Sequence, residues 1–212
     1  MRSKTEQELF WEGEFGNEYI KRNTAKDWGG LQSAKISDFS VFLRSSRGIK
    51  TSLEFGGNIG LNEVALATLI PNIKMSVVEI NETAAKQCSN IPNTRVYRQS
   101  IFDFDTTERF DLTFTCAVLI HINPDMLDVV YEKLYTYSSK YILIAEYYNP
   151  TPVEVEYRGN NGKLFKRDFA GEILDKYKDL ELIDYGFRYY RGGFSIPVTD
   201  DLTWFLMEKT NK

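Results

Sequence analysis

The chain has 212 residues, of which 42% are hydrophobic and 26% are charged, and its formal net charge is -4. This length supplies one sizeable core and is too short for two ordinary domains. The acidic balance argues against general nucleic-acid binding, and no apolar run approaches the roughly 18 residues that span a bilayer. Two distant cysteines and one histidine exclude a Cys/His metal cluster and fit a reducing compartment. We expect a cytoplasmic globular protein without a secretion signal, a metal, a membrane partner or a nucleic-acid partner.

Residues 1–48 are expected to form a helical lid ahead of the first strand. Two glycines among the aromatic residues of its first half favour a turn between short helices over one continuous helix. Residues 31–46 are predicted to be helical, because Phe39, Phe42 and their apolar neighbours supply one apolar face.

From Ile49 onward, short apolar segments alternate with segments of helical periodicity. The expected strands are Thr51–Phe55, Lys74–Glu79, Arg95–Arg98, Phe110–Cys116 and Lys140–Glu146. The expected helices between them are Leu61–Ile70, Glu82–Ser89 and Asp125–Tyr137. This alternation predicts a parallel sheet with helices on both faces, centred on a ligand-binding core over residues 49–148.

The pattern changes over residues 149–212, which are expected to form a loop, a helix and two late strands on the acceptor side of the molecule. A short strand is expected from Val153, and a helix over Asp168–Tyr177. Two strands, Glu181–Tyr190 and Leu202–Glu208, follow without a helix between them and predict an antiparallel hairpin at one sheet edge. The predicted fold class is therefore α/β, with a doubly wound, mostly parallel seven-stranded sheet and an N-terminal helical lid.

A glycine-rich turn, residues 56–60, follows the first expected strand. Strand, glycine turn and helix together let a backbone approach a nucleotide closely. Asn58 and Leu61 stand where a dinucleotide-binding turn has its second and third glycines, which disfavours NAD and FAD. No Gly-Lys-Ser/Thr follows, which excludes a phosphate-binding loop. Glu54, at the end of the strand, suits a ligand that carries an ammonium group.

Two further acids follow the next two strands. Glu79 ends the second strand, where a carboxylate can accept both hydroxyls of a ribose. Asp103 follows the third strand and can reach an adenine amino group, although forming a turn beside Asp105 is the alternative role.

These residues carry a resemblance. The segments 54–60 and 110–115, with Glu79 and Asp103 between them, resemble the successive motifs of class I S-adenosylmethionine-dependent methyltransferases over residues 49–146. In that family the glycine turn packs on the methionine part, the second-strand acid holds the ribose and the third-strand acid lies by the adenine. The family usually has glycine where this chain has Asn58. The resemblance implies S-adenosylmethionine as cofactor, S-adenosylhomocysteine as product, and cofactor contacts at Glu54, Phe55, Gly56, Asn58, Gly60, Glu79, Ile80, Ser100, Ile101, Phe102, Asp103, Thr115, Cys116 and Ala117.

A narrower resemblance covers nearly the whole chain. The segments 11–16, 19–23, 118–125, 145–150, 165–171 and 200–205 look like the pseudaminic acid biosynthesis-associated methylases. This resemblance implies methyl transfer to an oxygen or nitrogen of a small acceptor in surface-glycan (nonulosonic acid) metabolism. An N-methyltransferase for an amine-bearing metabolite or peptide, and a non-catalytic binding module that keeps the fold, are the alternatives.

Other residues are candidates for catalysis and for closing the site. His121, the single histidine, follows the fourth strand and can act as a general base near neutral pH, with packing against the sheet as the alternative. Glu146 and Tyr147 leave the fifth strand and can orient an acceptor. The lid supplies Trp11, Tyr19 and Arg22, and the Arg22 guanidinium suits the methionine carboxylate, whereas the aromatic residues can simply pack the lid.

Basic residues cluster after the fifth strand although the protein is acidic overall. The candidates for acceptor binding are Tyr148, Asn149, Tyr157, Arg158, Lys166 and Arg167. Such a cluster suggests an anionic acceptor, such as a carboxylated, phosphorylated or nucleotide-linked sugar, whereas a solvated surface is the alternative.

Overall fold

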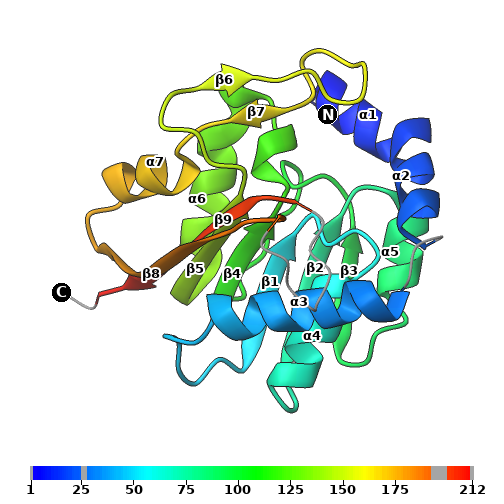
Figure 1. The fold of residues 1–212 in the computed structure, drawn as a ribbon. Helices are drawn as coiled ribbons and strands as arrows, with labels where there is room; N and C mark the ends of the chain where they lie inside the picture. Colours follow the sequence, from blue (N-terminus) through cyan, green and yellow to red (C-terminus); the bar gives the residue numbers. More distant parts are fainter. Residues whose placement is uncertain (1, 25–27, 192–199, 211–212) are drawn as a thin grey trace.

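The structure is a computed structural model in which residues 2–24, 28–191 and 200–210 are described. Its centre is a seven-stranded sheet of order β3-β2-β1-β4-β5-β9-β8 (Figure 1). The strands are β1 (Thr51–Phe55), β2 (Lys74–Glu79), β3 (Thr94–Arg98), β4 (Phe110–Cys116), β5 (Ser138–Glu146), β8 (Leu180–Arg188) and β9 (Leu202–Lys209). The five strands predicted for the core therefore form within two residues of their expected bounds.

The sheet is parallel from β3 through β5 and antiparallel beyond it. β1 pairs in parallel with β2 and β4, and β4 does so with β5. β9 then runs antiparallel between β5 and the edge strand β8. The predicted fold class, with its antiparallel edge hairpin, is confirmed.

Helices cover both faces of the sheet (Figure 1). One face packs against α3 (Trp28–Phe42) and α4 (Leu61–Leu69), where Phe39, Phe42 and Leu66 meet Phe114 and Leu143. The other face packs against α6 (Leu127–Tyr137) and α7 (Phe169–Lys176). Because successive strand side chains point to opposite faces, each buried strand contributes to both cores. α5 (Glu82–Cys88) connects β2 to β3.

The N-terminal region is helical, with the break that the glycines predict. α1 (Glu6–Glu12) ends at Gly13, and α2 (Glu14–Thr24) follows directly. Thr5 and Glu8 close a capping box at the start of α1. The helix predicted over residues 31–46 begins earlier, at Trp28, and ends at Phe42.

Residues 149–168 form a loop with a small second sheet. β6 (Val153–Glu154) pairs antiparallel with β7 (Phe165–Lys166). The strand expected from Val153 is short because the chain turns at residues 157–160, where Tyr157 and Asn160 form an isolated bridge. Across the described ranges 2–24, 28–191 and 200–210, no helix has the length and apolar character that crossing a bilayer requires.

Candidate active site

A cavity of about 430 Å³ lies at the carboxyl ends of β1 to β4, beneath α1 and α2. In the sheet β2 lies on one side of β1, and β4 lies on the other side of β1. The cavity is therefore at the point where the strand order reverses. We call the part beside Gly56, Glu79 and Ile101 the glycine-turn half. The part lined by Trp11, Tyr19, His121, Tyr147 and Tyr157 is the aromatic half.

The glycine turn forms one wall of the cavity by backbone contact. Gly56 has a φ of 77°, and a Cβ added there would lie 2.6 Å from Val118 Cγ2. A Cβ on Gly57 would lie 2.4 Å from Val77 Cγ1. Asn58, with a φ of 50°, takes a backbone conformation that asparagine tolerates better than most residues, so a third glycine is not required there. At Gly56 and Gly57 this wall, which we call the cradle, is therefore bare backbone, because a side chain at either position would clash with a neighbouring valine.

Glu79 lies in the same wall, as predicted for a carboxylate at the end of β2. It is buried, and its two oxygens accept the backbone N–H groups of Asn58 and Asn81, each at 2.7 Å. Burial raises the pKa of Glu79 to about 7, against the opposing effect of these hydrogen bonds. The carboxyl is thus fixed in direction at the cavity wall.

Glu54 lies behind the turn instead of facing the cavity, which corrects its expected position. Its side chain is completely buried, and Oε1 accepts the Asn62 amide at 2.6 Å. Burial raises the pKa of Glu54. Burial also raises the pKa of the adjacent Glu63, and the charge of Glu54 raises it more. Glu54 also shares a hydrogen bond with the Glu63 carboxyl, which favours the ionised form of Glu54 and the protonated form of Glu63.

The loop after β3 places Ser100, Ile101 and Phe102 in the cavity wall, but not Asp103. Asp103 is half exposed and forms an ion pair with Arg2, 3.1 Å from its Nε. The expectation that Asp103 faces the adenine therefore does not match its position.

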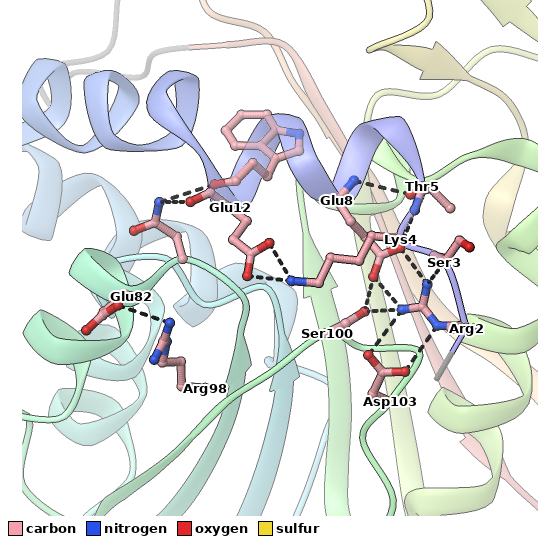
Figure 2. A network of polar contacts seen from close by, with 12 residues as sticks. Arg2, Ser3, Lys4, Thr5, Glu8, Glu12, Glu82, Arg98, Ser100 and Asp103 are labelled. Atoms are coloured by element: carbon pink, nitrogen blue, oxygen red, sulfur yellow. Dashed lines mark hydrogen bonds and ion pairs between the residues drawn. The ribbon is translucent and has the colours of Figure 1, made fainter.

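Glu8, and not Asp103, is the carboxylate that lines the cavity beside Ser100. It accepts the Arg2 guanidinium and the Ser100 hydroxyl (Figure 2). Burial opposes its ionisation, but the hydrogen bonds from Arg2 and Ser100 lower the pKa of Glu8 to about 2. Its sequence signal, the Thr5-x-x-Glu8 capping box, predicts only a role in starting a helix.

His121 lies in the aromatic half, between two aromatic rings. Its centroid is 4.6 Å from that of Trp11 and 4.9 Å from that of Tyr157. His121 Nδ1 lies 2.6 Å from the carbonyl oxygen of Lys163. Because a carbonyl only accepts, Nδ1 carries the proton and Nε2 keeps its lone pair. Burial lowers the pKa of His121 to about 4, so the ring is neutral at physiological pH and Nε2 can accept a proton.

The two candidates from the end of β5 differ in position. Glu146 is buried outside the cavity, and its carboxylate accepts N–H groups of residues 118–120 at 3.0 to 3.4 Å. The prediction that Glu146 orients an acceptor at the rim is wrong, because its oxygens hold the loop after β4. Burial raises its pKa to about 7. Tyr147 does line the cavity, and burial followed by the charge of Asp200 raises the pKa of its hydroxyl.

The other predicted cofactor residues divide by position. Trp11, Tyr19, Gly56, Asn58, Ile80, Ser100, Ile101, Phe102, Cys116 and Ala117 line the cavity with Glu79. Phe55, Gly60 and Thr115 lie behind the wall: Phe55 and Thr115 are fully buried, and Gly60 begins α4. Arg22 belongs to α2, but its side chain lies outside the described part.

Sequence reasoning missed Lys35 of α3. Lys35 lines the cavity, and its Nζ lies 3.3 Å from Cys116 Sγ. Burial opposes its charge, but Cys116 and Asp38 favour it, and the pKa of Lys35 is raised overall. A signal was available, because Lys35 precedes Phe39 by four residues and Phe42 by seven, on the apolar face of a predicted helix.

The residues predicted to bind the acceptor also lie in different places. Tyr157 and Arg158 line the aromatic half. Tyr148 and Lys166 line a second cavity of about 440 Å³ that shares Tyr147 with the first. Two candidates lie outside both cavities: Asn149 hydrogen-bonds to the Thr151 carbonyl at 2.6 Å, and Arg167 forms an ion pair with Glu172 at 2.6 Å.

Two residues from the late strands also reach the cavity, and of these the sequence indicates only Arg188, as one more base of the cluster suggested for an anionic acceptor. Arg188 of β8 and Asp200 before β9 line the cavity. Arg188 forms an ion pair with the buried Asp38 of α3, 150 positions away. Its sequence context gives no sign of this contact. Across residues 2–24, 28–191 and 200–210, no group of three or more His, Cys, Asp or Glu side chains could hold a metal ion.

Comparison with known proteins supports the architecture. No protein-family model matches the chain, and no curated protein matches its sequence. Among solved structures, the 1,6-didemethyltoxoflavin-N1-methyltransferase of Burkholderia thailandensis is similar, with a TM-score of 0.70 and 13% identity over 100% of this chain and 92% of that one. It was solved with bound 1,6-didemethyltoxoflavin and S-adenosylhomocysteine.

Two further structures share the fold over nearly their whole length. Magnesium protoporphyrin IX methyltransferase of Synechocystis PCC 6803, with bound S-adenosylmethionine, has a TM-score of 0.68 and 9% identity, covering 99% of this chain and 100% of that one. The plantazolicin methyltransferase BpumL, in complex with S-adenosylhomocysteine, has a TM-score of 0.67 and 11% identity, covering 96% and 94%. The chain therefore has the class I methyltransferase fold.

Proposed function

We propose that the protein is an S-adenosylmethionine-dependent methyltransferase that moves a methyl group to an oxygen or nitrogen of a small acceptor. One observation carries the proposal. The cradle at Gly56 and Gly57 and the fixed carboxyl of Glu79 line the same part of one cavity. Bare backbone lets the methionine part of the cofactor approach closely, and a carboxyl at the end of β2 suits the ribose hydroxyls.

The remaining cofactor groups also find partners in the glycine-turn half. Lys35 supplies a cation for the methionine carboxylate, with Arg22 as the partner expected from the sequence. Ile80 and Ile101 supply apolar surface for the adenine, and Glu79 takes the ribose. Similar structures solved with S-adenosylmethionine or S-adenosylhomocysteine support this assignment.

The chemistry asks little of the protein beyond alignment and removal of one proton. When bound, S-adenosylmethionine supplies a methyl group on a positively charged sulfur, which leaves as a neutral thioether when the carbon–sulfur bond breaks. The chain's part is to hold the acceptor in line with that methyl group. His121 Nε2 takes the acceptor's proton, and its Nδ1–H stays with the Lys163 carbonyl. Trp11 and Tyr157 hold the His121 ring.

For the acceptor we propose a small anionic molecule of the sugar type, as in surface-glycan metabolism. The whole-chain sequence resemblance supports it, as do Arg158 and Lys166, each at one of the two cavities. No ion pair involves either cation among the described residues. The amine-bearing metabolite is the second candidate, because the similar Burkholderia enzyme is by its name an N1-methyltransferase.

The decisive experiment has two stages. Calorimetry with S-adenosylhomocysteine is expected to show stoichiometric binding, and its absence would leave only the non-catalytic binding module. An acceptor screen by mass spectrometry, with S-adenosylmethionine and separate pools of nucleotide-linked sugars, acidic sugars, amines and peptides, is then expected to show a gain of one methyl in a sugar pool. A gain confined to the amine or peptide pool would overturn the sugar assignment while keeping the methyltransferase.

A further inference from the structure

We propose that α1 and the beginning of α2 clamp the adenine end of the cavity, and that Glu8 and Asn81 are the two points where the clamp is fastened. The clamp sets the separation of the loops after β2 and β3, and thereby the affinity for the cofactor. This inference rests on the proposed function, because it takes the adenine to lie between Ile80 and Ile101.

The first fastening point is on the loop after β3 (Figure 2). The Ser100 hydroxyl donates to Glu8 at 2.5 Å and accepts the N–H of Phe102 at 3.1 Å. Arg2 lies 4.7 Å above the Phe102 ring and forms an ion pair with Asp103. A segment nearly 100 positions earlier in the chain therefore holds this loop at Ser100, Phe102 and Asp103.

The second fastening point is on the loop after β2. Asn81 Nδ2 lies 3.2 Å from the carbonyl oxygen of Trp11 and 3.0 Å from Asn17 Oδ1, on either side of the break between α1 and α2. Its Oδ1 accepts the N–H of Ala84 and so caps α5. Asn81 is buried. Its amide nitrogen donates to α1 and α2, and its amide oxygen accepts from α5.

The two loops leave the ends of the neighbouring strands β2 and β3. The last register pair between β2 and β3 is Glu79 opposite Arg98. Beyond that pair the chain leaves the sheet on both strands, and Ile80 and Ile101 both line the cavity. α1 joins the loops by contacts at both of its ends. Their separation is therefore fixed only while α1 is docked.

Glu8 acts as a positioning residue rather than as a ligand contact. Its four carboxylate lone-pair positions are matched by four donors: two from Arg2, one from Ser100 and the backbone N–H of Thr5. No further donor is needed to satisfy this carboxylate. Its effect on the cofactor therefore passes through the loop that it holds.

Two conservative variants test the clamp. Glu8→Gln keeps the capping box, which accepts glutamine as well as glutamate, but removes the charge opposite Arg2. Asn81→Asp keeps the cap on α5 and removes the amide donors to α1 and α2. Each is expected to weaken S-adenosylhomocysteine binding about tenfold in calorimetry, a size typical of coupling between linked sites. Both substitutions act through one helix pair. The double variant should therefore bind S-adenosylhomocysteine only slightly more weakly than the single variant with the lower affinity.

The matched control is Glu12→Gln. Glu12 also lies on α1 and also pairs with a cation, Lys4, but its carboxylate contacts neither loop (Figure 2). This variant is expected to bind like the wild type. Equal weakening by Glu8→Gln and Glu12→Gln would show a general loss of helix charge and overturn the clamp.

Adenosine as a second probe separates this inference from the proposed function. The clamp variants should weaken adenosine and S-adenosylhomocysteine by the same factor, because both ligands carry the adenine. If the wild type binds S-adenosylhomocysteine and both clamp variants match it within twofold while melting cooperatively, the clamp is wrong. If the wild type binds neither ligand, the proposed function itself fails.

Discussion

The glycine-turn half of the cavity is built by the turns that follow β1, β2 and β3, whereas the aromatic half joins the ends of β4 and β5 to α1, α2 and the β6–β7 loop. In the first, Gly56 and Glu79 are fixed by the sheet and by backbone hydrogen bonds. In the second, Trp11 of α1, His121 after β4 and Tyr157 of the β6–β7 loop are held by packing on one another. The difference suggests that the first half fixes the cofactor and the second is free to vary with the acceptor.

The strongest way to break the glycine-turn half is Gly56→Ala. Its Cβ would meet Val118 and enter the surface that the ligand approaches, so affinity for S-adenosylhomocysteine should fall roughly 100-fold in calorimetry. Gly159→Ala is the control, because Gly159 also has a positive φ, 80°, but has open space around it. It should lose about 1 kcal/mol of stability and no affinity. Equal affinities in the two variants would exclude the cradle as a ligand surface.

The corresponding test of the aromatic half is His121→Asn, which keeps a donor for the Lys163 carbonyl and removes the base. Turnover at saturating acceptor should fall about 100-fold with little change in cofactor affinity. Because the His121 pKa is about 4, the base form is present above that pH and is lost below it. The wild-type pH profile should therefore lose activity near pH 4 and not near 6.5. A turnover within a few-fold of wild type would end the role of His121 as base.

These two halves also differ in how far the sequence predicts them. Strand ends predict where Glu54, the glycine turn and Glu79 lie. Because the carboxyl ends of parallel strands meet at one edge of a sheet, the sequence predicts that these residues are neighbours. Which way each side chain points was not predictable: Glu54 and Glu146 are buried, and Asp103 pairs with Arg2. Contacts such as Arg188 with Asp38 depend on packing of distant elements, which local periodicity does not encode.

A smaller effect is expected at Lys35, which lines the cavity beside Cys116. Lys35→Met keeps the length of the side chain and removes the cation, so S-adenosylhomocysteine should bind about tenfold more weakly while adenosine binds unchanged. Arg22→Ala, measured in parallel, tests the partner expected from the sequence. Weakening by Arg22→Ala alone would assign the methionine carboxylate to α2 and not to α3.

The smallest effect concerns stability. The pKa values of Glu79 and Glu146 are raised from 4.5 to about 7 by burial, so the folded state keeps protons that the unfolded chain releases between these values. The free energy of unfolding should fall as pH rises from 4.5 to 7, by at most about 1.4 kcal/mol per pH unit for each carboxyl. Glu146→Gln should flatten this slope in urea titrations. An unchanged slope would mean that Glu146 is ionised when buried.

The position of β9 has a consequence for the order of folding. β9 follows every other described strand in sequence, yet it lies inside the sheet, where Trp204 and Leu206 complete one of the two cores. Until residues 202–209 are in place, the outer edge of β5 remains unpaired and that core remains open. Such non-local pairing slows folding, and the unpaired edge is a template for association with other chains. Chains interrupted before Leu202 are therefore expected to aggregate during synthesis rather than to accumulate as partly folded monomers.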